Sequence, residues 1–251
     1  MAYTNSPLVD HTHISPNKTS PRNHAIDTIT IHCVVGQCYV ESLGNIFASQ
    51  SKQASSNYGI GKDGRIGMYV EEKDRSWCSS SAANDNRAIT IEVASDTYEP
   101  YAVTDAAYKA LLDLVTDICK RNGIKMLVWS ENKNDRVNHL NGCNMTVHRD
   151  YANKSCPGDY LYNRHAQIAA EVNKRLSGEN AKEENEMRYN TLADLKADKH
   201  NGEHYLPTVE KLLKNGILRG KGGSGDETIL DLGEDAVRIL VTLDRAGLYG
   251  E

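Results

Sequence analysis

The chain has 251 residues, of which 39% are apolar and 25% are charged, and its formal net charge is −5 at pH 7. This composition is ordinary for a folded globular protein, and the length has room for one sizeable domain plus a small one. No apolar run reaches the roughly eighteen residues that a transmembrane helix requires. The first residues lack the basic start and apolar stretch of a secretory signal, so none is expected.

The charge is uneven along the chain. Residues 1–176 hold 19 basic and 19 acidic side chains, whereas residues 177–251 hold 10 basic and 15 acidic ones. Neither part has the basic surface that nucleic-acid binding demands, so we expect neither nucleic acid nor a membrane as a partner. The six cysteines have no spacing typical of a disulfide framework, and we interpret them as reduced thiols.

In chain order, the first part reads as an extended segment, a strand and a helix. Prolines punctuate a lead-in over residues 7–24. Residues 28–33 (TITIHC) alternate polar and apolar side chains, which predicts a half-buried strand. Apolar residues at helical spacing predict a helix over residues 40–52. Three histidines of the lead-in lack an alternating strand around them, so we interpret them as surface residues rather than metal ligands: His11, His13 and His24.

A hairpin, a loop and a second strand follow. Residues 55–70 are predicted to form a hairpin that turns near Gly64, which can take a positive φ. Residues 71–86 are polar and predict a loop, in which Trp77 is either a binding residue or a plug at the edge of the core. Residues 88–94 (AITIEVA) repeat the alternation of the first strand.

The next segments complete the N-terminal region. Thr104 or Asp105 is predicted to cap a helix that runs to Asn122 and stops at Gly123. His165 shares the apolar stripe of a later helix, so we interpret it as a packing residue. The remaining predicted elements are a short strand at 126–129, a polar loop at 130–144, a strand at 145–148 (MTVH) and a helix at 158–176.

The C-terminal region is predicted to be separate. Residues 177–186 (SGENAKEENE) are polar and acidic, which is typical of a linker. Beyond this linker we expect a small helical domain over residues 187–251, with helices at 207–215 and 234–246.

Each of the three alternating strands carries a reactive side chain near its carboxyl end, on the face opposite the apolar one: His32, Glu92 and His148. Ligands of open α/β sheets bind outside those strand ends, and the loop after the third strand would fold Cys156 back over it. Two imidazoles and a thiolate suit Zn²⁺. We therefore predict zinc ligands at His32, His148 and Cys156, with Glu92 close but not a ligand. Cys143 is a rival third ligand, disfavoured because it precedes its strand.

Four segments carry a family resemblance: TITIHCVVGQ, SSNYGIGKDGRIGMYVEE, AITIEVAS and MTVHRDYANKSCPGDYL. They resemble the zinc-dependent N-acetylmuramoyl-L-alanine amidases of the T7-lysozyme and peptidoglycan-recognition-protein superfamily, of the type found in clostridial phage or prophage endolysins. The likeness covers residues 1–176 and is most specific over residues 148–158. It implies an α/β fold with a central mixed β-sheet flanked by helices, and a catalytic domain over residues 1–176.

The resemblance also implies a reaction. One Zn²⁺ would activate a water that hydrolyses the amide between N-acetylmuramic acid and L-alanine in peptidoglycan. Glu92 would take the proton of that water and pass it to the leaving amine, and Lys154 would stabilise the oxyanion. Some relatives carry a catalytic tyrosine seven residues before the aspartate of the hairpin turn. Ser56 occupies that position here, and we interpret Tyr58 as a packing residue.

Location and partners follow from the same resemblance. An endolysin is cytoplasmic without a signal peptide and acts on the cell wall after release through a holin pore. The C-terminal helices loosely resemble one S-layer-homology repeat, which implies binding to a cell-wall polymer. A core of this size is marginal, so self-association is also expected. Purine-rich codons before Met187 would create an internal translation start.

Three alternatives stay open. The C-terminal region can be a helical appendage without wall affinity. The N-terminal region can be a non-catalytic peptidoglycan-binding module, as in relatives that lack the cysteine ligand, although Cys156 is present here. A regulatory role toward an RNA polymerase, which one relative has, is the third.

Overall fold

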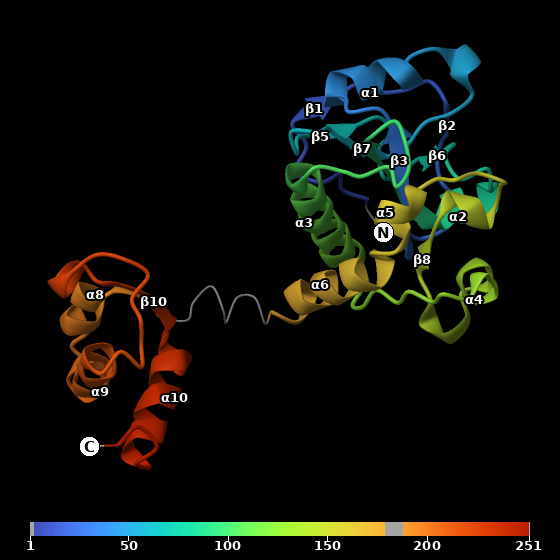
Figure 1. Cartoon of the computed structure of the whole chain (residues 1–251). Helices are drawn as coiled ribbons and strands as arrows, with labels where there is room; N and C mark the ends of the chain where they lie inside the picture. The colour runs from blue at the N-terminus through green and yellow to red at the C-terminus, as the bar shows by residue number, and fades with distance from the viewer. Residues whose placement is uncertain (1–2, 179–187, 251) are drawn as a thin grey trace. The chain divides into compact units, whose positions relative to one another are not determined.

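The computed structural model of the protein describes residues 3–178 and 188–250. These residues belong to two compact units within residues 1–179 and 180–251 (Figure 1). The predicted linker at 177–186 lies outside the described residues except for Ser177 and Gly178, and Met187 lies outside them as well. Among the described residues, no helix combines the length and apolar character needed to span a bilayer.

A six-stranded mixed sheet forms the centre of the N-terminal unit, in the order β1-β5-β4-β7-β3-β8. Strands β4, β7, β3 and β8 run parallel to one another, while β5 is antiparallel to β4, as the predicted hairpin requires. The predicted α/β class, with a central mixed sheet flanked by helices, is confirmed. The strands of this unit are β1 (His11–Thr12), β2 (Lys18–Thr19), β3 (Thr28–Val35), β4 (Tyr58–Ile60), β5 (Ile66–Met68), β6 (Arg75–Ser76), β7 (Ala88–Ser95) and β8 (Met145–Thr146).

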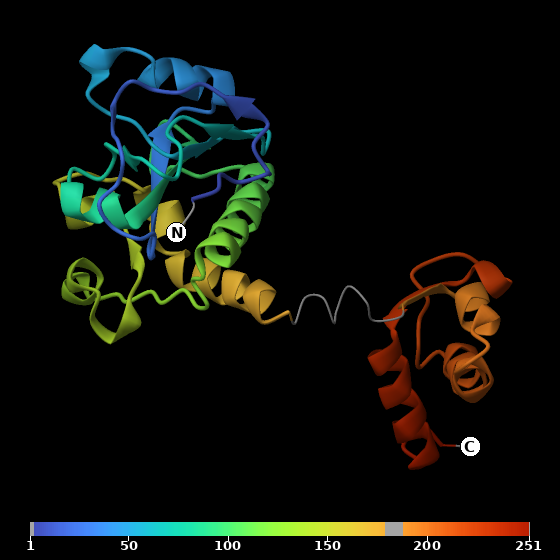
Figure 2. The ribbon, with the colours of Figure 1, turned by 180° about the vertical axis from the view of Figure 1, so that it is seen from behind.

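One face of the sheet is apolar and packs on two long helices, α3 (Asp105–Asn122) and α6 (His165–Ser177). Figures 1 and 2 show these helices side by side against the sheet. Helix α3 begins where the Thr104 hydroxyl accepts a hydrogen bond from the Ala107 N–H, and it ends at Gly123 with φ +72°, as predicted. The isoleucines that alternate onto this face are fully buried: Ile29, Ile31, Ile89 and Ile91.

The opposite face of the sheet buries polar side chains. Helix α2 (Ala82–Arg87) places Asn84 against two strands. Its amide donates to Thr30 Oγ1 at 3.0 Å and accepts from Thr146 Oγ1 at 2.9 Å. These buried hydroxyls and amides satisfy one another, and a smaller apolar cluster of Leu43, Phe47 and Tyr69 lies on the same face. Residues 71–86, which were predicted to be a loop, contain two elements, the strand β6 and the helix α2.

Three other predicted elements were wrong because side chains compete for backbone groups. Helix α1 (Val40–Phe47) stops short of residue 52 because Ser15 donates to the Phe47 carbonyl. Residues 126–129 form no strand, since the Val128 N–H donates to the Asn144 side chain. The helix predicted at 158–176 is divided into α5 (Gly158–Tyr162) and α6, because the His165 ring donates to the Leu161 carbonyl at 2.8 Å.

The remaining elements of the N-terminal unit are short. The third alternating strand, β8, has two residues rather than four, and the chain turns into a 3-10 helix at His148. The predicted loop at 130–144 contains a helix that Asn132 caps. These elements are α4 (Lys133–Asn138) and the 3-10 helices η1 (Gln50–Lys52), η2 (Leu140–Gly142) and η3 (His148–Asp150).

The C-terminal unit is mainly helical, as predicted, but it also contains an antiparallel pair of strands, β9 and β10, that sequence periodicity did not predict. Helix α9 starts five residues before Pro207, since Tyr205 is buried against Tyr189 with ring centroids 6.4 Å apart. The elements are β9 (Arg188–Thr191), α8 (Leu192–Ala197), α9 (Gly202–Lys214), η4 (Gly225–Glu227), β10 (Ile229–Gly233) and α10 (Glu234–Arg245).

Candidate metal centre

His32 and Glu92 occupy equivalent positions on adjacent strands. Their Cα positions are partners in the parallel register of β3 and β7. The His32 side chain is fully buried. Burial, and then the neighbouring His148, lower the pKa of His32 well below its ordinary value. The imidazole is therefore neutral and has a lone pair to offer a metal ion.

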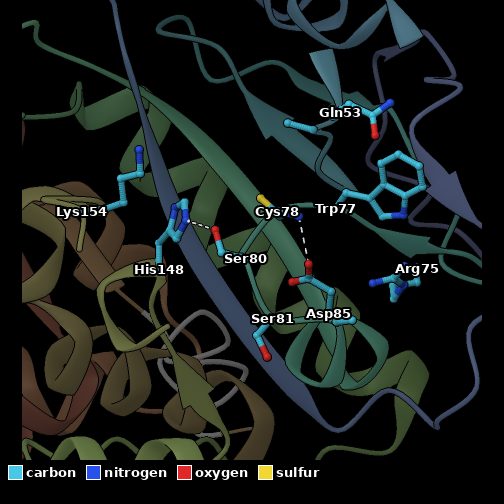
Figure 3. Close-up of a pocket in the computed structure, with 11 residues that line it drawn as sticks. Gln53, Arg75, Trp77, Cys78, Ser80, Ser81, Asp85, His148 and Lys154 are labelled. Atoms are coloured by element: carbon cyan, nitrogen blue, oxygen red, sulfur yellow. Dashed lines mark hydrogen bonds between the residues drawn. The ribbon is translucent and has the colours of Figure 1, made fainter. Parts of the chain in front are cut away.

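His148 opens the 3-10 turn after β8, and its ring centroid is 5.1 Å from that of His32. Its Nε2 lies 3.0 Å from the Ser80 hydroxyl, a contact drawn in Figure 3. This hydrogen bond occupies Nε2 and leaves Nδ1 for another partner. Burial, and then Lys154, lower the pKa of His148, so this imidazole too is neutral near pH 7.

Cys156 completes the group. Its Sγ lies 3.4 Å from His32 Nδ1, and the Cys33 amide donates to the same sulfur at 3.5 Å. The ligand atoms of His32, His148 and Cys156 all lie within 4.8 Å of one another. The structure thus brings together the three residues that the sequence predicted as ligands.

The donor set fits zinc. Zn–N and Zn–S bonds of about 2.0 and 2.3 Å at a tetrahedral angle place nitrogen and sulfur about 3.6 Å apart, close to the 3.4 Å between His32 Nδ1 and Cys156 Sγ. The hydrogen bond with the Cys33 thiol, burial and nearby Glu92 raise the pKa of Cys156 well above its ordinary value. A cation would therefore displace one proton, from Cys156, because both imidazoles are already neutral.

Glu92 stands beside this group. One carboxylate oxygen, Oε1, lies 3.8 Å from the Cys78 sulfur, and the other, Oε2, is buried without a hydrogen-bond partner among the described residues. Burial, followed by the Cys33 thiol, raises the pKa of Glu92 to about 8. Such a carboxyl group is poised to exchange a proton near neutral pH.

A groove of about 510 Å³ opens next to the donors. Lys154 and Arg75 contribute charged side chains to its wall. In Figure 3 Lys154 lies beside His148, whereas Trp77 and Arg75 lie across the groove. Trp77 lines the groove, and its indole N–H donates to Thr19 Oγ1 at 2.9 Å. Lys154 is exposed, so its ammonium is accessible to a ligand in the groove.

Sequence reasoning missed the segment that carries Cys78 and Ser80. Asp85 of α2 holds this segment by accepting a hydrogen bond from the Cys78 amide at 2.9 Å, drawn in Figure 3, and another from the Ser79 amide at 3.1 Å. The Ser81 hydroxyl caps α2 by accepting from the Asn84 N–H. Ser81 followed by an acidic residue in the first turn was the one local signal for this helix.

The other residues weighed from the sequence lie away from the donors. Tyr58 is fully buried, and its hydroxyl donates to Glu72 Oε1 at 2.7 Å, a packing role. Cys143 precedes β8, and its thiol donates to the Met145 carbonyl. His165 is fully buried, with its ring 4.4 Å from that of Trp129. His11 and His13 lie 6.3 Å apart near α1, and His24 contacts the Ala25 carbonyl.

The structure therefore defines an α/β protein with two imidazoles and a thiol converging at the carboxyl ends of its strands. The chain belongs to the N-acetylmuramoyl-L-alanine amidase family, whose sequence profile matches residues 22–159. The matched range contains all five predicted site residues, and the predicted amidase family is confirmed. No curated protein matches the chain.

Several solved structures are similar. N-acetylmuramoyl-L-alanine amidase LysC from Clostridium intestinale has 16% identity and a TM-score of 0.49, covering 67% of this chain and 99% of its own. The selenomethionine derivative of AmpD has 19% identity and a TM-score of 0.47, with coverage of 67% and 99%. Drosophila peptidoglycan recognition protein SD has 16% identity and a TM-score of 0.43, with coverage of 62% and 94%.

Proposed function

We propose that the N-terminal region, residues 1–176, is an endolysin-type amidase. It would hydrolyse the amide between N-acetylmuramic acid and L-alanine in peptidoglycan, with Zn²⁺ held by His32, His148 and Cys156. The observation that carries the proposal is the convergence of these three donors, within 4.8 Å of one another, inside the region matched by the amidase family. When bound, zinc supplies the Lewis acidity that makes a nucleophile available from water near pH 7.

Glu92 is the proposed proton carrier. Its carboxyl group lies next to the donors, and Oε2 has no hydrogen-bond partner among the described residues. In its ionised form it would accept a proton from the attacking water and later deliver that proton to the departing amine of L-alanine. Burial raises the pKa of Glu92, which brings it closer to the pKa values of the groups with which Glu92 exchanges protons.

Lys154 is proposed to stabilise the negative charge that develops on the scissile carbonyl oxygen. Its side chain is exposed on the groove wall beside His148 (Figure 3). Removing a comparable donor from an oxyanion site costs about 3–4 kcal/mol of transition-state stabilisation. The groove is also where a glycan and its stem peptide would lie, with Trp77 offering its indole face to a sugar ring.

Metal analysis combined with mass spectrometry of digested peptidoglycan tests the proposal. The purified chain should contain one zinc per molecule and release stem peptides with a free L-alanine amino group. Cys156→Ser should lose activity and the zinc held with His32 and His148, because it removes a ligand of that position. Glu92→Gln should retain zinc and lose about 10²–10⁴-fold in turnover.

A non-catalytic peptidoglycan-binding module is the competing function. It predicts that the chain sediments with purified cell walls and releases no amino groups at any zinc concentration. That result would end the amidase proposal. Normal turnover by Glu92→Gln would leave the amidase standing and remove only the role of Glu92.

For the C-terminal region, residues 187–251, we propose binding to a cell-wall polymer, with self-association as a second role. Large apolar side chains on its surface support a contact role, among them Ile239 at 59% and Leu248 at 67% exposure. The full chain should sediment with purified walls more completely than a chain ending at Gly178. Light scattering of the two forms tests self-association. For the whole protein we propose holin-type release from the cytoplasm.

A further inference from the structure

Cys78 places a second thiol at the candidate metal centre. It follows β6 and lines both the groove and an adjoining hollow of about 290 Å³ that reaches Cys33, Glu92 and His148. Its Sγ lies 3.8 Å from Glu92 Oε1. No role in the proposed reaction uses this thiol.

The distances around Cys78 match those of a metal site. The ligand atoms of His32, Cys78 and Glu92 all lie within 4.8 Å of one another, and this set shares only His32 with the first one. A tetrahedral zinc ion places a sulfur and a carboxylate oxygen about 3.6 Å apart, close to the 3.8 Å between Cys78 and Glu92. Imidazole, thiolate and carboxylate are all usual zinc ligands.

Two buried atoms in this set have no hydrogen-bond partner among the described residues, His32 Nε2 and Glu92 Oε2. The His32 side chain is fully buried. A buried polar atom without a partner is unfavourable, and a cation bound at this position would give the Glu92 carboxylate the partner that it lacks.

We propose that Cys78, Glu92 and His32 form a second position for a thiophilic divalent ion such as zinc. Binding replaces the proton of the Cys78 thiol, and that of Glu92 where it is protonated, and both protons pass to solvent. Where the first position is already filled through His32 Nδ1, the second also displaces the remaining His32 ring proton to solvent, so it fills only at higher metal concentration.

An ion in the second position is inhibitory. It coordinates the carboxylate that the proposed mechanism needs as a proton carrier, and it binds His32 through Nε2, the ring nitrogen opposite the one that faces Cys156. This consequence rests on the proposed function, whereas binding of the ion does not. Excess zinc should therefore reduce activity, and Cys78 should decide the concentration at which it does so.

Cobalt titration of the full chain tests binding without any measurement of activity. Zinc is spectroscopically silent, but Co²⁺ bound to a thiolate gives a charge-transfer band in the near ultraviolet. Cys156→Ala removes the sulfur of the first position, so the band that remains belongs to Cys78. The double variant Cys78→Ala, Cys156→Ala should lose the band entirely. Cys119→Ala, which changes a core thiol away from the donors, is the matched control and should titrate as the unchanged chain does.

Absence of the band in Cys156→Ala, with a circular dichroism spectrum like that of the unchanged chain, would overturn the proposal. Persistence of the band in the double variant would overturn it as well. Adding Glu92→Gln to Cys156→Ala provides an independent check without changing a thiol. This change should weaken Co²⁺ binding at least tenfold, and unchanged affinity would remove Glu92 as a ligand.

The inhibitory consequence has its own readout. Cys78→Ala should raise the zinc concentration for half-inhibition of wall digestion about tenfold or more. Inhibition at the same zinc concentration as the unchanged chain would refute it. A chain that never digests cell walls would refute the proposed function, while the cobalt titration would still decide whether the second position exists.

Discussion

The two halves of the candidate metal centre are held in different ways. His32 and Glu92 lie on β3 and β7, where a continuous parallel ladder fixes their Cα positions as partners. His148 and Cys156 belong to a 3-10 turn and a loop, outside the ladder of the sheet, and their side chains contact Ser80 and the Cys33 amide. We call these the strand half and the loop half. Many backbone hydrogen bonds hold the strand half in place, so a single substitution should displace side chains of the loop half more than those of the strand half.

The largest expected effect comes from Arg136→Ala, beneath the loop half. Arg136 makes two hydrogen bonds of 2.9 and 2.6 Å to Asp150, and the two side chains are 3% and 1% exposed. Asp150 in turn accepts from the Val147 N–H, next to His148. Removing Arg136 leaves a buried carboxylate unpaired, which should lower the free energy of unfolding by about 3–5 kcal/mol in urea denaturation.

Arg87→Ala is the matched control. Arg87 pairs with Asp27 at 2.6 Å near the start of β3, but the two side chains are 32% and 38% exposed. Solvent screens such a pair, so its loss should cost only about 0–1 kcal/mol. Equal losses of unfolding free energy in the two variants would mean that burial of the Arg136–Asp150 pair does not stabilise the loop half.

The next effect is a pH dependence that arises from His165, which packs against Trp129 near the Arg136 pair. Burial lowers the pKa of His165 to about 4. An unfolded chain has a histidine pKa of about 6.5, so it binds more protons than the folded chain between these values. Stability should therefore fall by up to about 3 kcal/mol as the pH drops from about 6.5 to 4.

Urea denaturation at several pH values, compared with His165→Gln, isolates this contribution. The variant should lose stability at neutral pH but show a flatter decline between pH 6.5 and 4. Parallel curves for the two proteins would show that His165 is protonated in the folded chain, which would contradict its placement as a neutral packing residue.

The sequence predicted the strand half and the loop half of the site to different extents. Alternation in residues 28–33 and 88–94 was enough to place His32 and Glu92 at neighbouring strand ends, because a period of two fixes which face each side chain takes. Nothing local in the run of serines 79–81 indicates that one hydroxyl reaches His148, 68 residues later in the chain. Cys78 was missed for the same reason, because tertiary packing rather than local sequence brings it next to Glu92. In the loop half, His148 was predicted from the alternation in residues 145–148 and Cys156 from its spacing across the loop that follows, and the family resemblance agreed with both.

Ser80→Ala should affect the metal more than the fold. The Ser80 hydroxyl fixes the His148 ring through Nε2, and removing such a supporting contact typically weakens metal binding about 10–100-fold. Zinc affinity measured by competition with a chelating dye provides the test. Ser51→Ala, whose hydroxyl contacts nearby Ser49, is the control and should bind zinc normally. Equal affinities for the two variants would show that the ring is held by packing alone.

The smallest effect should come from Ser81→Ala, at the cap of α2. The Ser81 hydroxyl accepts from the Asn84 N–H, and losing an N-cap costs about 1 kcal/mol. Helix α2 carries Asn84 and Asp85, which hold Thr30, Thr146 and the Cys78 amide in place. Ser81→Asp, which restores a capping oxygen, should recover the loss in urea denaturation. Asn84 and Asp85 keep their own partners when the cap is lost, so zinc affinity should change less in Ser81→Ala than in Ser80→Ala. The reverse order would show that helix α2, rather than the hydroxyl that contacts His148, positions the loop half.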